Sequence, residues 1–130
     1  AYEIGVRLVG SEMCIRDSKL SVARDIFRKN RVHHLPIVHG TQLIGILTTY
    51  DIFKMIDSKD DYDKILIKDV MTTHVATLEP EDKVGSAAEL FLENLFHAVP
   101  IVKDGELKGI VTSFDVIKYE FHKEYPTQEI

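Results

Sequence analysis

Apolar residues recur at helical spacing in two separate stretches of the chain. The first stretch has Leu20, Ala23, Ile26 and Phe27, and the second has Val84, Ala87, Ala88, Phe91 and Leu95. This spacing gathers apolar side chains on one face and predicts two amphipathic helices. Ahead of the second helix, residues 79–82 place Pro80 and three acids where they favour a helix start, with the proline near the first turn.

Each predicted helix is followed by a short apolar segment that contains a proline. The predicted strands are residues 35–38 and 42–47 in the first half, residues 99–102 and 106–111 in the second half, and residues 75–78 ahead of the second helix. Turn residues lie between the strands of each half, and Asp104-Gly105 is a strong hairpin signal. A further helix is predicted to begin near Thr48 and near Thr112. Both halves therefore predict a helix, a hairpin and a helix.

The chain repeats itself with a period of 64 residues. Residues 19–54 align without gaps over residues 83–118, and 14 of these 36 positions are identical. The identical pairs include Ala23/Ala87, Phe27/Phe91, Asn30/Asn94, His33/His97, Pro36/Pro100, Gly45/Gly109, Thr48/Thr112 and Asp51/Asp115. Two copies, unlike the three or more of a solenoid, predict an α+β pair related by a pseudo-two-fold axis, with a ligand cleft between the copies.

The first copy lacks the opening of the second. Met13 stands where Thr77 stands, and Arg16 stands where Pro80 stands. We therefore expect residues 1–18 to be an atypical segment that is not the native start of this module. The predicted domains are the first copy at 19–57, a linker at 58–67, the second copy at 68–122 and a tail at 123–130.

Composition narrows the function classes. The 130 residues are 45% apolar and carry a net charge of −5, which argues against a general nucleic-acid binder. No apolar run approaches the roughly 18 residues that span a bilayer, and no secretory signal is evident. The single cysteine, Cys14, excludes an internal disulfide. We expect a soluble cytoplasmic protein that binds neither nucleic acid nor membrane.

The strongest local pattern is Gly-x-x-Thr-x-x-Asp, at residues 45–51 and again at residues 109–115. The threonine falls at a helix N-cap, where free N–H groups favour an anion such as phosphate. The aspartate could accept hydrogen bonds from paired hydroxyls such as those of a ribose. The same pattern also predicts a capping box, which needs no ligand. Both interpretations stay open, and they can coexist.

Together, the repeated helix, the apolar-Pro-apolar strand and this motif resemble a tandem pair of CBS domains, or Bateman module, over residues 19–121. The resemblance implies two βαββα repeats, the first with an atypical opening strand, and an adenosyl ligand such as AMP, ADP, ATP or S-adenosylmethionine. It implies that Thr48 and Thr112 contact phosphate and that Asp51 and Asp115 contact ribose. The other residues that it implies at the ligand are Ile46 and Ile110 beside the base, and Thr77. It also implies a homodimer.

The repeated histidines are further candidates. In the gamma subunit of AMP-activated protein kinase, which is similar, a basic residue at the position of His33 and His97 reaches phosphate. His34 offers another base in the first copy, where the second copy has Ala98. The alternative is that these histidines make only local hydrogen bonds where a helix ends.

No signature of catalysis or of a metal site is evident. We expect a non-catalytic regulatory module that needs no cofactor and acts on an unidentified partner protein. The alternative is a structural or dimerisation module with a vestigial pocket.

Overall fold

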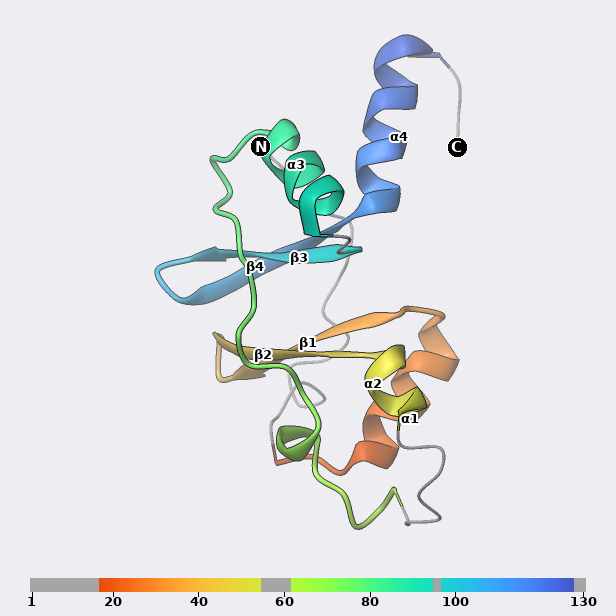
Figure 1. Cartoon of the computed structure of the whole chain (residues 1–130), viewed down its shortest axis with the longest axis vertical. Helices are drawn as coiled ribbons and strands as arrows, with labels where there is room; N and C mark the ends of the chain where they lie inside the picture. The colour runs from red at the N-terminus through yellow and green to blue at the C-terminus, as the bar shows by residue number, and fades with distance from the viewer. Residues whose placement is uncertain (1–16, 55–61, 95–96, 128–130) are drawn as a thin grey trace. The chain divides into compact units, whose positions relative to one another are not determined.

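The computed structural model describes residues 17–54, 62–94 and 97–127. The predictions for residues 1–16, which include Met13 and Cys14, for residues 55–61, for Leu95 and for residues 128–130 lie outside this part of the chain. The elements are α1 (Leu20–Asn30), β1 (His34–His39), β2 (Gln42–Thr48), α2 (Thr49–Phe53), the 3-10 helix η2 (Ile67–Asp69), α3 (Val84–Asn94), β3 (Ala98–Lys103), β4 (Glu106–Thr112) and α4 (Ser113–Glu124) (Figure 1). The predicted order of helix, hairpin and helix is confirmed in both copies.

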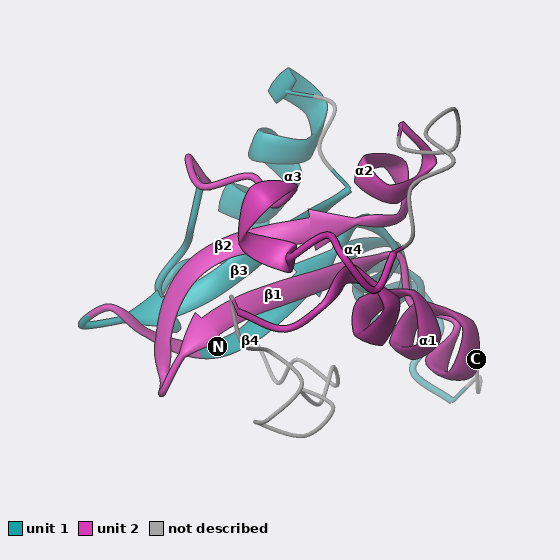
Figure 2. Cartoon of the chain, turned by 90° about the horizontal axis from the view of Figure 1, so that it is seen from below, with its two compact units in different colours: residues 1–7, 76–104, 108–130 teal, residues 8–75, 105–107 magenta. Residues whose placement is uncertain are grey.

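The chain divides into two compact units, coloured separately in Figure 2. Of the described residues, unit 2 holds 17–54, 62–75 and 105–107, which include the first repeat. Unit 1 holds 76–94, 97–104 and 108–127, which are most of the second repeat. The pseudo-two-fold relation between the repeats and the shared cleft stay predictions.

In unit 2, β1 and β2 form an antiparallel hairpin. The register runs from His34 opposite Thr48 to His39 opposite Gln42, with an irregularity between Ile37 and Val38. Gly40 turns the chain at a φ of +64°, a conformation that glycine adopts without strain. The outer end of β2 also pairs with residues 105–107: Leu43 N–H donates to Gly105 O (3.1 Å), and Leu107 N–H donates to Thr41 O (2.9 Å).

The core of unit 2 lies between α1 and this hairpin. Its buried residues are Leu20, Ala23, Ile26, Phe27, Leu35, Ile37, Val38, Leu47 and Ile67. Ile67 comes from η2 and is fully buried. The backbone holds the segment in place, because Ile67 N–H donates to Ser18 O (2.8 Å) and Leu20 N–H donates to Ile65 O (2.7 Å). Residues that follow the first repeat in sequence therefore complete its core.

Unit 1 repeats this plan with α3, β3, β4 and α4. Its buried cluster is Ala87, Phe91, Val99, Ile101 and Val111. Asp104 and Gly105 connect β3 to β4 at positive φ (53° and 81°), as a two-residue hairpin turn requires. Since α3 and α1 bury equivalent residues, the helical periodicity of the sequence is confirmed in both repeats.

Two local predictions for the second repeat are wrong. Residues 75–78 do not form a strand, because Leu78 alone bridges β3: its N–H donates to Pro100 O (3.0 Å), and its O accepts from Val102 N–H (2.7 Å). The acids near Pro80 are not in the first turn of α3, which begins at Val84. Glu79 N–H instead donates to Asp82 Oδ2 (2.7 Å), so these residues close a turn of their own before the helix.

Among the described residues, no helix is long and apolar enough to cross a bilayer. Within the same part of the chain, no three His, Cys, Asp or Glu side chains are grouped so that they could hold a metal ion.

Candidate functional site

The repeated motif lies at the junction between a strand and a helix in each repeat. β2 ends at Thr48 and α2 begins at the next residue, while β4 ends at Thr112 and α4 follows it. Both threonines are helix N-caps with extended backbones, at φ values of −118° and −112°. The prediction that the motif lies where a strand ends and a helix begins is therefore confirmed in both copies.

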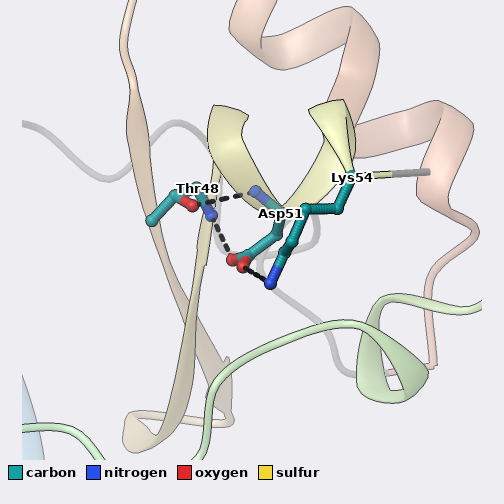
Figure 3. A network of polar contacts seen from close by, with 3 residues as sticks. All are labelled: Thr48, Asp51 and Lys54. Carbon is teal, nitrogen blue, oxygen red and sulfur yellow. Dashed lines mark hydrogen bonds and ion pairs between the residues drawn. The ribbon is translucent and has the colours of Figure 1, made fainter. Parts of the chain in front are cut away.

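Thr48 and Asp51 form a complete capping box, which Figure 3 shows. Asp51 N–H donates to Thr48 Oγ1 (3.1 Å), and Thr48 N–H donates to Asp51 Oδ2 (2.9 Å). Thr112 and Asp115 repeat both bonds at 3.1 and 2.8 Å. The capping interpretation is confirmed in both repeats. It fixes each carboxylate through one of its two oxygens.

The histidines lie beside these helix starts. Thr49 N–H donates to His33 O (3.1 Å), and Ser113 N–H donates to His97 O (2.9 Å). Both histidines are exposed. The fold therefore brings histidine, threonine and aspartate together within each repeat. In each repeat, the histidine carbonyl and the threonine hydroxyl each accept a hydrogen bond from one of the N–H groups that a helix start leaves free. Fewer of these N–H groups therefore remain for an anion.

His34 distinguishes the first repeat from the second. It lies opposite Thr48 in the hairpin register and is partly buried. The second repeat has Ala98 at the first position of β3. A second imidazole therefore lies near the motif threonine in the first repeat alone.

The two aspartates differ in burial and in their contacts. The Asp51 side chain is only 7% exposed, and its Oδ1 lies 3.6 Å from Lys54 Nζ. That ammonium group also lies 5.0 Å from the centre of the Tyr50 ring. Asp115 is partly exposed, and its Oδ2 accepts a further bond from the Thr112 hydroxyl (2.9 Å). Among the described residues, only Asp51 has a cation beside it.

Ile46 and Ile110 are both buried. Each precedes a residue of the unit's own core, Leu47 or Val111, and strand alternation therefore turns it to the opposite face. Ile46 also exchanges two backbone hydrogen bonds with Thr72, both of 2.9 Å. Thr77 is exposed, and no hydrogen bond described in the structure joins it to Thr112 or Asp115.

Two residues near the motif were not anticipated from the sequence. Lys54 was overlooked, although its identity with Lys118 across the repeat was a visible signal. The closeness of Met71 to Gly45 had no signal in the sequence: a Cβ on Gly45 would lie 2.9 Å from Met71 Sδ and 2.8 Å from Thr72 O. Gly45 is therefore required because another segment crosses the strand there.

A family model described as CBS domain matches residues 13–58 and 67–122. Inosine-5'-monophosphate dehydrogenase of Korarchaeum cryptofilum is 30% identical over 107 residues, which are 82% of this chain and 21% of that protein. Homoserine O-acetyltransferase of Methanohalobium evestigatum is 35% identical over 96 residues, 72% of this chain and 19% of the relative. The chain thus spans about a fifth of the length of these two relatives.

Solved structures share the fold. Protein MJ1225 of Methanocaldococcus jannaschii matches with a TM-score of 0.74 and 29% identity, covering 82% of this chain and 43% of that one. CBSX2, solved in complex with AMP, matches with a TM-score of 0.74 and 24% identity, covering 85% of this chain and 87% of that one.

Proposed function

The chain belongs to the CBS domain family and carries two copies of that domain, and from this premise we propose that it is a regulatory module that binds an adenine nucleotide or another adenosyl ligand. In this proposal the module performs no catalysis, and the ligand changes how it acts on a partner protein. A ligand can have this effect only if it binds one arrangement of the module more tightly than another.

The main support for this proposal is that both repeats hold an aspartate in a fixed orientation at the start of a helix. The capping box uses Oδ2 of Asp51 and of Asp115, so it leaves Oδ1 available for another partner. A carboxylate held in a fixed orientation is a good acceptor for the two hydroxyls of a ribose.

The neighbouring groups suit the rest of a nucleotide. We assign phosphate contacts to Thr48, Thr112, His33 and His97, with His34 adding to the first repeat. Ile46 and Ile110 would lie beside the base, and Thr77 would complete the second site. The fold shared with CBSX2, which was solved with AMP, makes AMP the first ligand to test.

Thermal unfolding with and without ligand tests this function. At about millimolar concentration, at least one of AMP, ATP and S-adenosylmethionine should raise the melting temperature by a few degrees. A ligand that binds only the folded state stabilises that state. Asp115→Asn keeps a carbonyl oxygen for the Thr112 N–H but replaces the second acceptor with a donor, so it should reduce the shift. Asp104→Asn, in the β3–β4 turn, is the matched control. No shift with any of the three ligands would contradict the proposal.

A second candidate function, a dimerisation module, is favoured by a repeated pair of exposed apolar residues. Tyr50 and Phe53 on α2 are 65% and 64% exposed, and their counterparts Phe114 and Ile117 on α4 are 59% and 66% exposed. Residues three apart share a helix face, so each helix presents an apolar pair to solvent. Sedimentation velocity should detect a homodimer that the double substitution Phe53→Gln and Ile117→Gln weakens. A wild-type monomer at all concentrations would exclude this candidate.

A further inference from the structure

The two aspartates are not equally available to a ligand. In the first repeat, Oδ2 of Asp51 accepts the Thr48 N–H and Oδ1 lies 3.6 Å from Lys54 Nζ (Figure 3). In the second repeat, both bonds to Asp115 from Thr112 reach Oδ2. Among the described residues, Oδ1 of Asp115 has no protein partner.

We propose that Lys54 sets the ligand affinity of the first repeat by competing for Oδ1 of Asp51. This inference rests on the proposed function, because it assigns that oxygen to a ligand hydroxyl. A hydroxyl that binds there must displace the ammonium group, whereas no residue in the described ranges competes for Oδ1 of Asp115. The second repeat therefore fills first and the first repeat fills at higher ligand concentration.

Two contacts hold Lys54 in this position. The Asp51 carboxylate is nearly buried, so its charge is poorly hydrated and gains more from a nearby cation than an exposed carboxylate does. The Tyr50 ring, 5.0 Å from the same Nζ, adds a cation–π contact. Both contacts place the ammonium group on the side of Asp51 that the capping box does not use.

The second repeat provides an internal comparison. Lys118 and Phe114 stand at the positions of Lys54 and Tyr50, with the same spacing from the motif aspartate. Within the described part of the chain, Lys118 forms neither an ion pair with Asp115 nor a cation–π contact with Phe114. The sequence alone would have assigned the same role to both lysines, and the difference arises from the conformation of the side chains.

Lysine substitutions measured by calorimetric titration with AMP test the proposal. In an Asp115→Asn background, which removes the carboxylate of the second repeat, Lys54→Met should tighten AMP binding to the first repeat about two- to five-fold, the range expected when a partly exposed ion pair is released. In an Asp51→Asn background, Lys118→Met should leave the affinity of the second repeat unchanged. Lys54→Gln repeats the test with a polar side chain, and the ligand-free melting temperature of each variant verifies that it is folded.

The outcomes separate this inference from the proposed function. Absence of AMP binding to the wild-type chain, in a preparation where ATP and S-adenosylmethionine also fail to bind, would overturn both. Binding that Asp51→Asn weakens but Lys54→Met leaves unchanged would overturn only the role of Lys54. Weaker binding after Lys54→Met would also overturn it, because Lys54 would then contact the ligand instead of competing with it.

Discussion

In the first repeat, the junction between β2 and α2 holds a buried aspartate with a lysine beside it. In the second repeat, the junction between β4 and α4 holds a partly exposed aspartate whose capping threonine adds a hydroxyl bond to it. The helices also differ, since α2 has 5 residues and α4 has 12. The backbone hydrogen bonds of the two capping boxes nevertheless agree within 0.1 Å.

This comparison separates what the motif dictates from what its surroundings dictate. The motif alone fixes the cap, because threonine and aspartate three residues apart satisfy each other's backbone amides. The ionic partner of the aspartate depends on its surroundings and on side-chain conformation, because Lys54 and Lys118 have the same spacing from the motif and only Lys54 lies beside its aspartate in the described structure. One motif can therefore place its aspartate in two different surroundings within one chain.

Substitutions in the two buried cores should have the largest effect on stability, and they test whether the two repeats are equivalent. Phe27 and Phe91 stand at equivalent positions of α1 and α3 and are 7% and 8% exposed. Replacing either with alanine should lower the free energy of unfolding by about 3–5 kcal/mol, because each leaves a cavity in a buried cluster. Urea unfolding followed by circular dichroism measures both losses. Leu92→Ala, at an 81% exposed position, is the control and should change stability by less than about 0.5 kcal/mol.

A pronounced loss for only one of the two phenylalanines would show that the second core does not hold its repeat together as the first one does. The first cluster recruits Ile67 from beyond the repeat, whereas the described part of the second cluster draws on α3, β3 and β4. Comparable losses of stability for the two variants would show that the core of the first repeat is already stable without the contribution of Ile67.

A smaller effect is expected where Met71 and Thr72 cross the first repeat. Gly45→Ala should destabilise the chain by about 1–3 kcal/mol, because its Cβ would come within 2.8 Å of Thr72 O and the backbone would have to move. Gly85→Ala is the matched control, since nothing lies within 4 Å of a Cβ there and alanine is the better helix former. Thermal unfolding of the two variants should shift in opposite directions. A neutral Gly45→Ala would mean that the crossing segment yields easily.

Much of this fold was predictable from the sequence, because its signals were local and occurred twice. Helical spacing located α1 and α3, and the turn residues located both hairpins. The capping box followed from the motif itself. That His33 and Thr48 contact one ligand was implied by the family resemblance and stays a prediction. The sequence did not reveal the hydrogen bond from Thr49 N–H to the His33 carbonyl, which brings the two residues close together.

The features that escaped prediction depend on contacts distant in sequence. Whether residues 75–78 form a strand depends on how far β3 pairs with them, and only Leu78 does so. The burial of Ile67 depends on a segment folding back onto α1. The pairing of Lys54 but not Lys118 depends on side-chain conformation, which identical spacing does not determine.

The next prediction compares how much the two capping boxes contribute to stability. Thr48→Ala and Thr112→Ala should each cost about 1 kcal/mol of stability, because each removes the acceptor for the aspartate N–H. We expect the loss at Thr112 to be the larger, since its hydroxyl also donates to Asp115. Thr→Ser at each position keeps the hydroxyl and should restore most of the loss. Chemical denaturation without ligand measures these differences, and equal losses would remove this distinction between the repeats.

The smallest effect concerns the ion pair of Lys103 with Glu81 in the second repeat, whose side chains are 42% and 58% exposed, in contrast to the nearly buried Asp51. The hydrogen bond from Lys103 lowers the pKa of Glu81 below its ordinary value of 4.5, and Glu81 raises the pKa of Lys103 above its ordinary value of 10.5. The stability that Glu81 contributes is therefore present above pH 4.5 and is lost as the pH falls through its lowered pKa. The contribution of Lys103 is present below pH 10.5 and is lost as the pH rises through its raised pKa. Melting temperatures of the wild type and of Lys103→Met should differ slightly at neutral pH and converge at both extremes, and added salt should reduce the difference. A difference that persists below the lowered pKa of Glu81 would mean that Lys103 stabilises unit 1 through the packing of its aliphatic chain and not through its charge.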